Sequence, residues 1–219
     1  RPPQDGSESE SKCFHSPVKA KETHRPLLGG SEIQRYVLRW TGNYVDYGNW
    51  LAEPRSPDWF EGTRILIREV TAKGVIQATI VDSDFVFSNS VDCVKLFRDD
   101  YSPLFMLAVI NSKLISFYNS NTSANAFKDS FPKVLIKDLL NFPVPKLALS
   151  NSADKARHDR MVALVEAMLG AKRQLAGAGT EAERNLYERK CANLDAQIDA
   201  LVYELYDLTP QEIALVGGV

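Results

Sequence analysis

Apolar residues recur at helical spacing over the last third of the chain, and this periodicity constrains the fold more than any other feature. The glycine-rich segment at 176–180 separates two sets, and Thr180 and Glu183 have the spacing of a capping box that begins a second helix. Because the connection is short, we expect two long helices packed as an antiparallel hairpin. The two sets follow steps of three and four residues: Met161, Leu164, Met168, Ala171 and Leu175, then Tyr187, Cys191, Leu194, Ile198, Leu201, Leu205 and Leu208.

The second set also forms a heptad seam, sustained for about three repeats. Two outcomes are open for it. The seam can close the hairpin within one chain, which we favour, or it can form an intermolecular coiled coil with dimerisation through 180–208. After the seam, Thr209, Pro210 and Glu212 have the pattern of an N-cap, a first-turn proline and a capping glutamate, which predicts a short last helix.

The middle of the chain has the composition of β-strands. Segments 64–70, 75–82 and 85–97 are rich in Val, Ile, Phe and Thr, and Gly74 suits a hairpin turn between the first two. The three segments therefore predict an antiparallel meander. Residues 1–24 are polar, which predicts a mobile tail or linker, with order beginning near residue 25.

A helix and an extended strip follow the strands. Ser102 and Pro103 have the pattern of an N-cap and first helical residue, and the helix is expected to run to about Tyr118. A polar loop at 119–126 precedes the sequence FPKVLIKDLLNFPVP at 131–145, whose prolines favour an extended chain. The predicted fold class is α+β: a recognition domain over 25–150, with a mixed or antiparallel sheet and a packed helix, followed by a long antiparallel helical hairpin over 151–219.

Composition sets limits on the kind of protein. The three cysteines, Cys13, Cys93 and Cys191, are far apart, so neither a disulfide framework nor a zinc site is expected, and a reducing, cytoplasmic environment fits best. The sequence contains no run of about 18 apolar residues, so no membrane-spanning helix is predicted. The net charge of −2 means that any nucleic-acid-binding face must be local. Since the sequence does not begin with Met, we expect a fragment of a longer chain.

No pattern typical of a catalytic site is found in the sequence. The sole Pro-Pro pair, Pro2 and Pro3, is followed by Gln4 rather than by the aromatic residue that an amino-methyltransferase uses to grip a flipped base. The sequence GAGTE follows a helix, whereas a phosphate-binding glycine loop follows a strand. The pair Cys13 and His15 is too small to predict a metal site. The chain is therefore expected not to be an enzyme by itself.

Several blocks together resemble a known family. The order RPLLGGSEIQRYVL, RILIREV, FVFSNSVDCVKL, LFMLAVINSKLISFY and FPKVLIKDLLNFPVP is similar to the target-recognition domain of Taq-type adenine-N6 DNA methyltransferases and type IIG restriction-modification enzymes. Type I specificity subunits share the ending. The resemblance covers about residues 25–146, with Ala108-Val109 in place of the usual Gly-Ile and Ser31 before the acidic Glu32. The paired helices after it look like the spacers that join or align recognition domains.

The resemblance implies a function in DNA recognition. It implies a non-catalytic module that reads a short sequence in double-stranded DNA while a separate methyltransferase domain or subunit acts on the adenine. S-adenosylmethionine, and Mg²⁺ if the parent protein cleaves DNA, would then be needed by the parent and not by this chain. A protein-interaction adaptor that uses the heptad helices, with no nucleic-acid role, is the alternative. Salt-sensitive DNA binding would separate the two.

Candidate DNA contacts follow from residue type and position. Arg68 ends a strand and is a candidate for guanine or phosphate, with a structural ion pair to Asp82 or Asp84 as the alternative. Asn89 and Ser90 interrupt an apolar strand, which indicates either a bulge that aims a side chain or an ordinary turn. Asn111, within the helix motif, is expected to bridge backbone groups of the fold. The full candidate set is Arg68, Lys73, Asn89, Ser90, Asn121, Asn125, Lys128, Lys133 and Lys137.

Base-reading residues must differ between family members that read different sequences. We therefore expect the shared motif residues to form the scaffold and the irregular segments 42–50, 53–62 and 119–128 to carry the determinants. For Trp50 and Trp59 we favour anchoring roles over base stacking, and for the lysines a solvated surface position is the alternative to phosphate contact.

Overall fold

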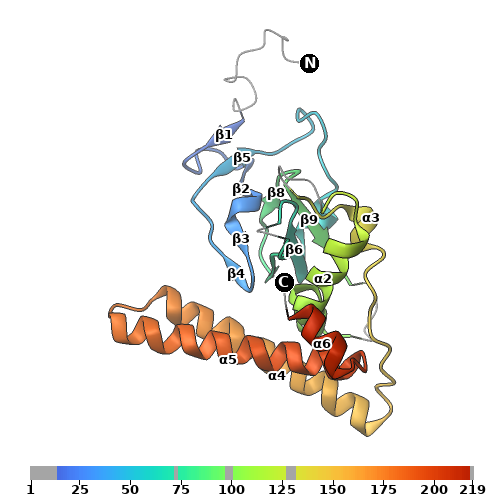
Figure 1. Cartoon of the computed structure of the whole chain (residues 1–219). Helices are drawn as coiled ribbons and strands as arrows, with labels where there is room; N and C mark the ends of the chain where they lie inside the picture. Colours follow the sequence, from blue (N-terminus) through green and yellow to red (C-terminus); the bar gives the residue numbers. More distant parts are fainter. Residues whose placement is uncertain (1–13, 72–73, 97–100, 127–131, 218–219) are drawn as a thin grey trace.

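A computed structural model of the chain describes residues 14–71, 74–96, 101–126 and 132–217. Short strands and three small helices form one part of the molecule, and two long helices lie across one end of it (Figure 1). The α+β class is thus confirmed. None of the helices in these ranges is long and apolar enough to cross a membrane.

The central sheet contains β6 (Arg64–Arg68), β7 (Ala78–Val81) and β9 (Val91–Val94), all antiparallel. The predicted hairpin between β6 and β7 is confirmed, and Gly74 has the positive φ of 80° that favours glycine. The meander is wrong, because β6 lies between β7 and β9. The segment predicted as one strand over 85–97 is interrupted by a turn at Asn89 and Ser90, which separates β8 (Val86–Phe87) from β9.

A second sheet has the order β1-β5-β2-β8, in which β8 runs parallel to β2. Its other strands are β1 (His15–Ser16), β2 (His24–Leu28) and β5 (Tyr44–Asp46). Residues 14–24 were predicted to belong to a polar tail, but β1 pairs with β5 and the His24 side chain is buried. The strand was not predicted because the segment has a mostly polar composition, with too few of the apolar residues that usually indicate a strand. Two short helical turns, η2 (Gly30–Glu32) and η3 (Pro57–Phe60), and a ladder of β3 (Ile33–Gln34) with β4 (Val37–Leu38) complete this half.

The single helix predicted from Pro103 to Tyr118 is wrong, because Ser112 divides it into α1 (Pro103–Asn111) and α2 (Lys113–Thr122). Ser112 has an extended backbone, and its hydroxyl accepts a hydrogen bond from the amide of Ile115 at 3.2 Å. The residue therefore ends one helix and caps the next. The Ser102 cap and Pro103 are at the start of α1 as predicted. The strip at 132–145 is mostly extended, apart from the short α3 (Ile136–Leu139).

The hairpin consists of α4 (Ser152–Ala176) and α5 (Glu181–Leu205), followed by α6 (Pro210–Val216). The capping boxes predicted at Thr180 and Thr209 are both present. Seam residues Cys191, Leu194, Ile198 and Leu201 are buried in the chain's own core. The seam thus closes an intramolecular hairpin, and dimerisation through 180–208 would have to use other residues.

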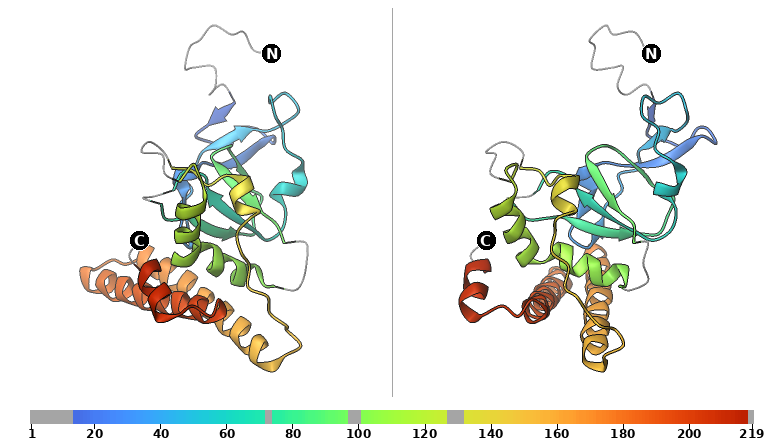
Figure 2. Two further views of the ribbon diagram at one scale, coloured as in Figure 1. Left: turned by 45° about the vertical axis from the view of Figure 1, so that its right-hand side comes forward. Right: turned by 90° about the vertical axis from the view of Figure 1, so that its right-hand side faces the viewer.

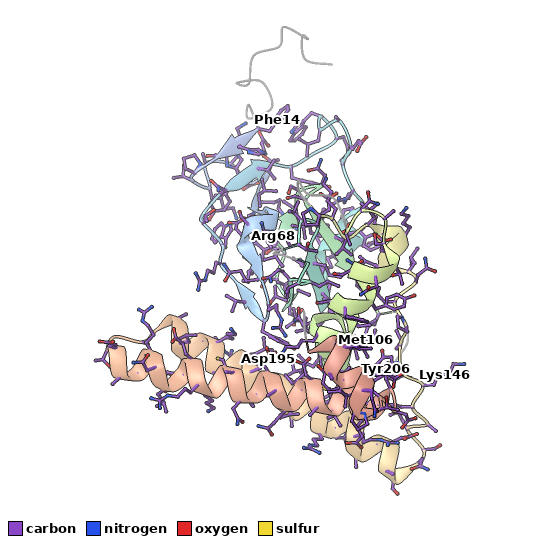
Figure 3. All side chains as sticks on the ribbon, in the orientation of Figure 1. Phe14, Arg68, Met106, Lys146, Asp195 and Tyr206 are labelled. Carbon is purple, nitrogen blue, oxygen red and sulfur yellow. The ribbon has the colours of Figure 1, made fainter. Side chains whose placement is uncertain are left out.

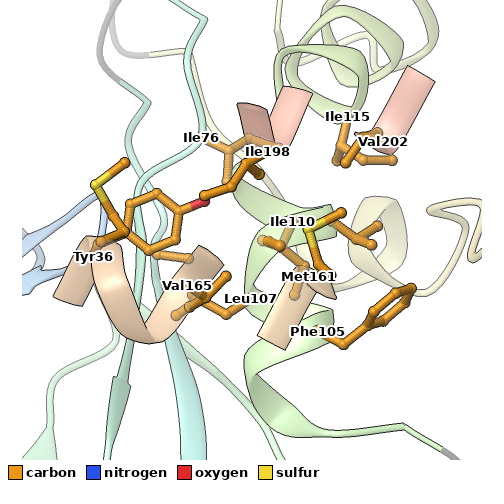
Figure 4. Packing of buried hydrophobic residues seen from close by; sticks show 14 of the residues in the cluster. Tyr36, Ile76, Phe105, Leu107, Ile110, Ile115, Met161, Val165, Ile198 and Val202 are labelled. Carbon is orange, nitrogen blue, oxygen red and sulfur yellow. The ribbon is translucent and has the colours of Figure 1, made fainter. Parts of the chain in front are cut away.

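One core is shared by the sheet, α1 and the hairpin, and Figure 4 shows how its side chains meet. Leu107 and Ile110 of α1 pack with Met161 and Val165 of α4 and with Ile198 of α5. The two further views in Figure 2 show α1 between the strands and the long helices, with α2 beside the strands. A separate smaller core, which includes Leu28, Phe60 and Phe87, fills the other end of the strand-rich part.

Candidate nucleic-acid interface

The shared sequence motifs form buried contacts within the scaffold. The amide of Gly30 donates a hydrogen bond to Oγ of Ser90 at 2.9 Å, and Oγ of Ser90 lies 2.7 Å from Oγ of Ser88. A Cβ on Gly30 would lie 2.8 Å from the Ser90 carbonyl oxygen, which is too close for any other residue without a backbone shift. Glycine at this position allows η2 to pack against the turn before β9.

The Asn-Ser-Lys triplet that ends α1 joins three parts of the fold. Asn111 is 1% exposed, and its side chain both accepts from the amide of Ala78 and donates to the Ala78 carbonyl, each at 3.0 Å. The amide of Lys113 donates to Oδ1 of Asp199 on α5 at 3.0 Å. Asn111 thus bridges backbone groups of the fold as expected, and Ser112 is also buried, with its hydroxyl donating to the Val109 carbonyl.

Arg35 is another motif residue that acts within the fold. Its guanidinium makes two parallel hydrogen bonds to the carboxylate of Asp195, at 2.7 and 2.9 Å, and a third at 2.9 Å to the carbonyl of Asn111. Figure 3 labels Asp195 on α5, on the side toward the strands. Arg35, Asn111 and Gly30 therefore hold the scaffold together, as expected for residues shared between proteins that read different sequences.

Several of the candidate DNA contacts gather at the end of β6. The amide of Glu69 donates to the Ser90 carbonyl at 3.0 Å, so the Asn89-Ser90 turn lies beside Arg68 and Glu69. Val70 forms a β-bridge with Lys133, and the Lys133 amide reaches the Asn125 carbonyl at 3.4 Å. We call this the β6-end surface, made of Arg68, Glu69, Asn89, Asn125 and Lys133.

The members of the β6-end surface differ in how they are used. Asn89 is exposed, whereas Nζ of Lys133 forms an ion pair with Glu69 at 3.1 Å. The proposed partner of Arg68, Asp84, lies instead 3.8 Å from Arg25. Arg64, four residues earlier at the start of β6, is the structural arginine of this strand, because it is buried and donates to three carbonyl groups.

The remaining candidates lie nearby or outside the described ranges. Asn121 is exposed and donates to the Phe117 carbonyl of its own helix at 2.7 Å. Lys137 is exposed on α3. The turn at Gly74 approaches α2, since a Cβ there would lie 3.1 Å from Oγ of Ser120. Lys73 and Lys128, like the Cys13 of the Cys13-His15 pair, fall outside the described residues.

A half-buried carboxylate borders this surface. Burial, together with the negative charge of Glu69, raises the pKa of Asp92 to about 6, against the opposing positive charge of Arg55. Oδ2 of Asp92 is buried and has no hydrogen-bond partner within the described part of the chain. A carboxyl group in this state is protonated more easily than an ordinary aspartate.

Arg55 was missed as a candidate, although its segment 53–62 was singled out. The residue is exposed, its guanidinium stacks over the Phe87 ring at 4.7 Å and donates to the Phe87 carbonyl at 3.1 Å. Trp50 and Trp59 on either side of it are 52% and 40% exposed. Arg55 could have been predicted as a DNA contact from its sequence context, since it is a basic residue between two prolines in an irregular segment that contains tryptophan.

Nothing in the described ranges forms a metal centre, since no group of three or more His, Cys, Asp or Glu side chains has suitable geometry there. Cys93 and Cys191 are free thiols, and burial raises the pKa of each. An open hollow of about 450 Å³ is lined by residues of β2, of β5 and of the segment before β8, among them Arg25, Tyr44 and Phe85.

The fold, with its motif residues bonded inside the scaffold and its irregular segments exposed, is that of a specificity domain. The chain belongs to the family of TaqI-like C-terminal specificity domains, which matches residues 25–144. The resemblance expected from the sequence is thus confirmed.

Two known proteins are similar over most of the chain. A protein of Methanocaldococcus jannaschii named "Putative type II restriction enzyme and methyltransferase" is 26% identical over 214 residues, covering 92% of this chain and 16% of that protein. The type IIL restriction-modification enzyme MmeI, whose structure is in complex with DNA, matches with a TM-score of 0.59 at 15% identity, covering 89% of this chain and 30% of that one. This chain thus spans a small part of the length of both.

Proposed function

We propose that this chain is the DNA sequence-recognition module of a restriction-modification adenine-N6 methyltransferase and that it positions double-stranded DNA for a separate catalytic domain. The observation that carries the proposal is that the motif residues make contacts within the fold, whereas the residues that could read DNA lie at its surface. Motif residues such as Arg35 and Asn111 bond inside the fold, while the irregular segments and the β6-end surface remain at the outside.

The chemistry of the β6-end surface suits DNA. Arginine pairs with guanine, asparagine with adenine, and lysine with phosphate, and Arg68, Asn89 and Lys133 supply one of each. The neighbouring carboxylates Glu69 and Asp92 can accept a hydrogen bond from the amino group of cytosine. Exposed Arg55, whose guanidinium lies over the Phe87 ring and donates to the Phe87 carbonyl, adds a positive charge near Asp92.

The parent protein would supply the reaction. The sequence shows no glycine-rich motif of the kind that joins a strand to a helix and holds a phosphate-bearing or nucleoside cofactor. We therefore assign S-adenosylmethionine, and Mg²⁺ if the parent cleaves DNA, to another part of the parent polypeptide or complex. This chain would contribute binding and orientation without touching the reacting atoms. A DNA-binding role also fits the reducing, cytoplasmic environment that the cysteine pattern predicts.

A pooled selection of random duplexes tests the proposal. The chain is incubated with the pool at low and at near-physiological salt, and bound duplexes are sequenced. We expect a short enriched motif whose binding weakens as salt rises. Binding without any motif would contradict sequence recognition. No binding at either salt calls for the same selection with the full-length parent, and failure there as well would favour the adaptor function.

A further inference from the structure

We propose that Arg35 and Asp195 set the angle between the helical hairpin and the strands, so that the hairpin positions the DNA-reading surface. The inference rests on the proposed function and extends it to residues far from any loop that would touch DNA. Asp195 is then a positioning residue for recognition.

The corner that carries Arg35 is held in an uncommon backbone conformation. Tyr36 has a φ of 61°, in the left-handed region, although it is not glycine, and its side chain is 3% exposed. Its amide donates to the Ala78 carbonyl at 2.9 Å. A strained conformation persists only where the surroundings fix it. Here it directs the Arg35 guanidinium toward α5, where both terminal nitrogens meet the Asp195 carboxylate.

A second carboxylate of the same helix anchors a different corner. Asp199, one turn beyond Asp195, accepts from the Lys113 amide at the α1–α2 junction. Arg35 also reaches that junction through the Asn111 carbonyl. One face of α5 is therefore attached at two separate points, and two attachments fix the rotation of a helix as well as its distance.

The apolar core beneath these contacts holds the hairpin against the sheet. Because burial itself is non-directional, the core fixes the angle of the hairpin less sharply than a directional contact does. A two-pronged arginine–carboxylate contact adds geometric specificity. The side chains of Arg35 and Asp195 are 22% and 25% exposed, so the pair lies at the edge of the core. A directional contact at this place can fix the orientation of the hairpin.

A continuous set of contacts joins this pair to the β6-end surface. Asn111 holds Ala78 of β7 through two hydrogen bonds, Ala78 pairs with Ile67 of β6, and Ile67 precedes Arg68. A change in hairpin angle would thus reach the residues proposed to read DNA through packed and hydrogen-bonded neighbours.

Distance measurements between spin labels test the angle directly. Labels are placed at Val18→Cys and Leu186→Cys, which are 60% and 56% exposed, in a chain with Cys13, Cys93 and Cys191 replaced by alanine. We compare wild type with Asp195→Ala and with Arg35→Lys. The lysine keeps the positive charge but cannot make two parallel hydrogen bonds to the Asp195 carboxylate. Lys155→Gln, which removes an ion pair to Asp159 within α4, is the matched control.

We expect a broader distance distribution in Asp195→Ala and Arg35→Lys, with the control unchanged. For a duplex enriched from the random pool, we expect the preference over a scrambled duplex to fall roughly tenfold. Melting curves identify any variant that fails to fold. If Asp195→Ala fails to fold, the distance measurement is made on Arg35→Lys.

Each contrary result has its own meaning. An unchanged distribution in folded variants overturns the proposal. A broader distribution with undiminished discrimination overturns the positioning role. If neither the wild-type chain nor its full-length parent enriches a motif, the proposed function fails, and the labelled chains alone still decide whether the pair sets the angle.

Discussion

Asn111 and Ala78 are joined by a pair of hydrogen bonds, in which the side-chain amide of Asn111 satisfies both the N–H and the C=O of Ala78. Both residues are buried. The Asn111 side chain thus acts like one rung of a β-ladder, because it gives β7 the partner that a neighbouring strand would otherwise supply. This contact explains why an apolar helix ends in a polar residue.

Replacing Asn111 with alanine should lower the free energy of unfolding by about 2 kcal/mol, because the buried amide of Ala78 loses its partner. The Ala78 carbonyl keeps its bond from the Tyr36 amide, which limits the loss. Urea denaturation measures the change. Asn121→Ala is the control, since Asn121 is exposed and bonds within its own helix. Equal stability of the two variants would contradict the bridging role.

Two glycines should respond to alanine in opposite directions. Gly30→Ala forces a Cβ to within 2.8 Å of the Ser90 carbonyl and should destabilise the chain by roughly 1–3 kcal/mol. Gly170 lies inside α4 with open space around it, so Gly170→Ala should stabilise the chain by up to about 1 kcal/mol through helix propensity. Thermal melting of both variants tests this contrast, and destabilisation by both would refute it.

Local sequence signals predicted the elements whose causes are local. The caps at Ser102, Thr180 and Thr209 and the turn at Gly74 involve residues within a few positions of each other, and all are present. Helical periodicity over 154–208 likewise predicted the hairpin, because two long helices offer many apolar positions to the pattern.

Long-range pairing produced the errors. The break at Ser112 occurs inside an apolar run, because Asn111 and Lys113 bond to partners 33 and 86 residues away. The pairing of β1 with β5 and the central place of β6 depend on contacts that no local pattern encodes. In the candidate interface, residue type made Arg68 and Asn89 candidates, and their contact with DNA stays a prediction. That Ser90 bonds to Gly30 and Lys133 to Glu69 is visible only in the fold.

Asp92 should make stability depend on pH. Its folded-state pKa, about 6, is above the ordinary value of an aspartate, so the folded chain binds a proton more readily than the unfolded chain. Stability should therefore fall as pH rises from about 4 to about 6, by about 1 kcal/mol after allowance for solvent screening. Asp92→Asn should remove this loss and be more stable than wild type at pH 7.5, but not at pH 4. Urea melts across this range are the measurement, and parallel pH profiles for the two proteins would count against it.

Lys137 and Lys133 should affect DNA binding differently, although they are four residues apart. Lys137 is exposed on α3, whereas Lys133 is engaged by Glu69 at 3.1 Å and joined to Val70 through the backbone. A lysine that contacts phosphate releases counterions on binding, so Lys137→Gln should weaken binding of all duplexes alike and reduce the slope of log K against log salt by about 1. Lys133→Gln should change that slope less, because its charge is already partly neutralised by Glu69. Fluorescence anisotropy titrations at several salt concentrations measure both slopes. If Lys133→Gln has the larger effect, the ion pair with Glu69 opens when DNA binds, and Lys133 rather than Lys137 is the phosphate contact.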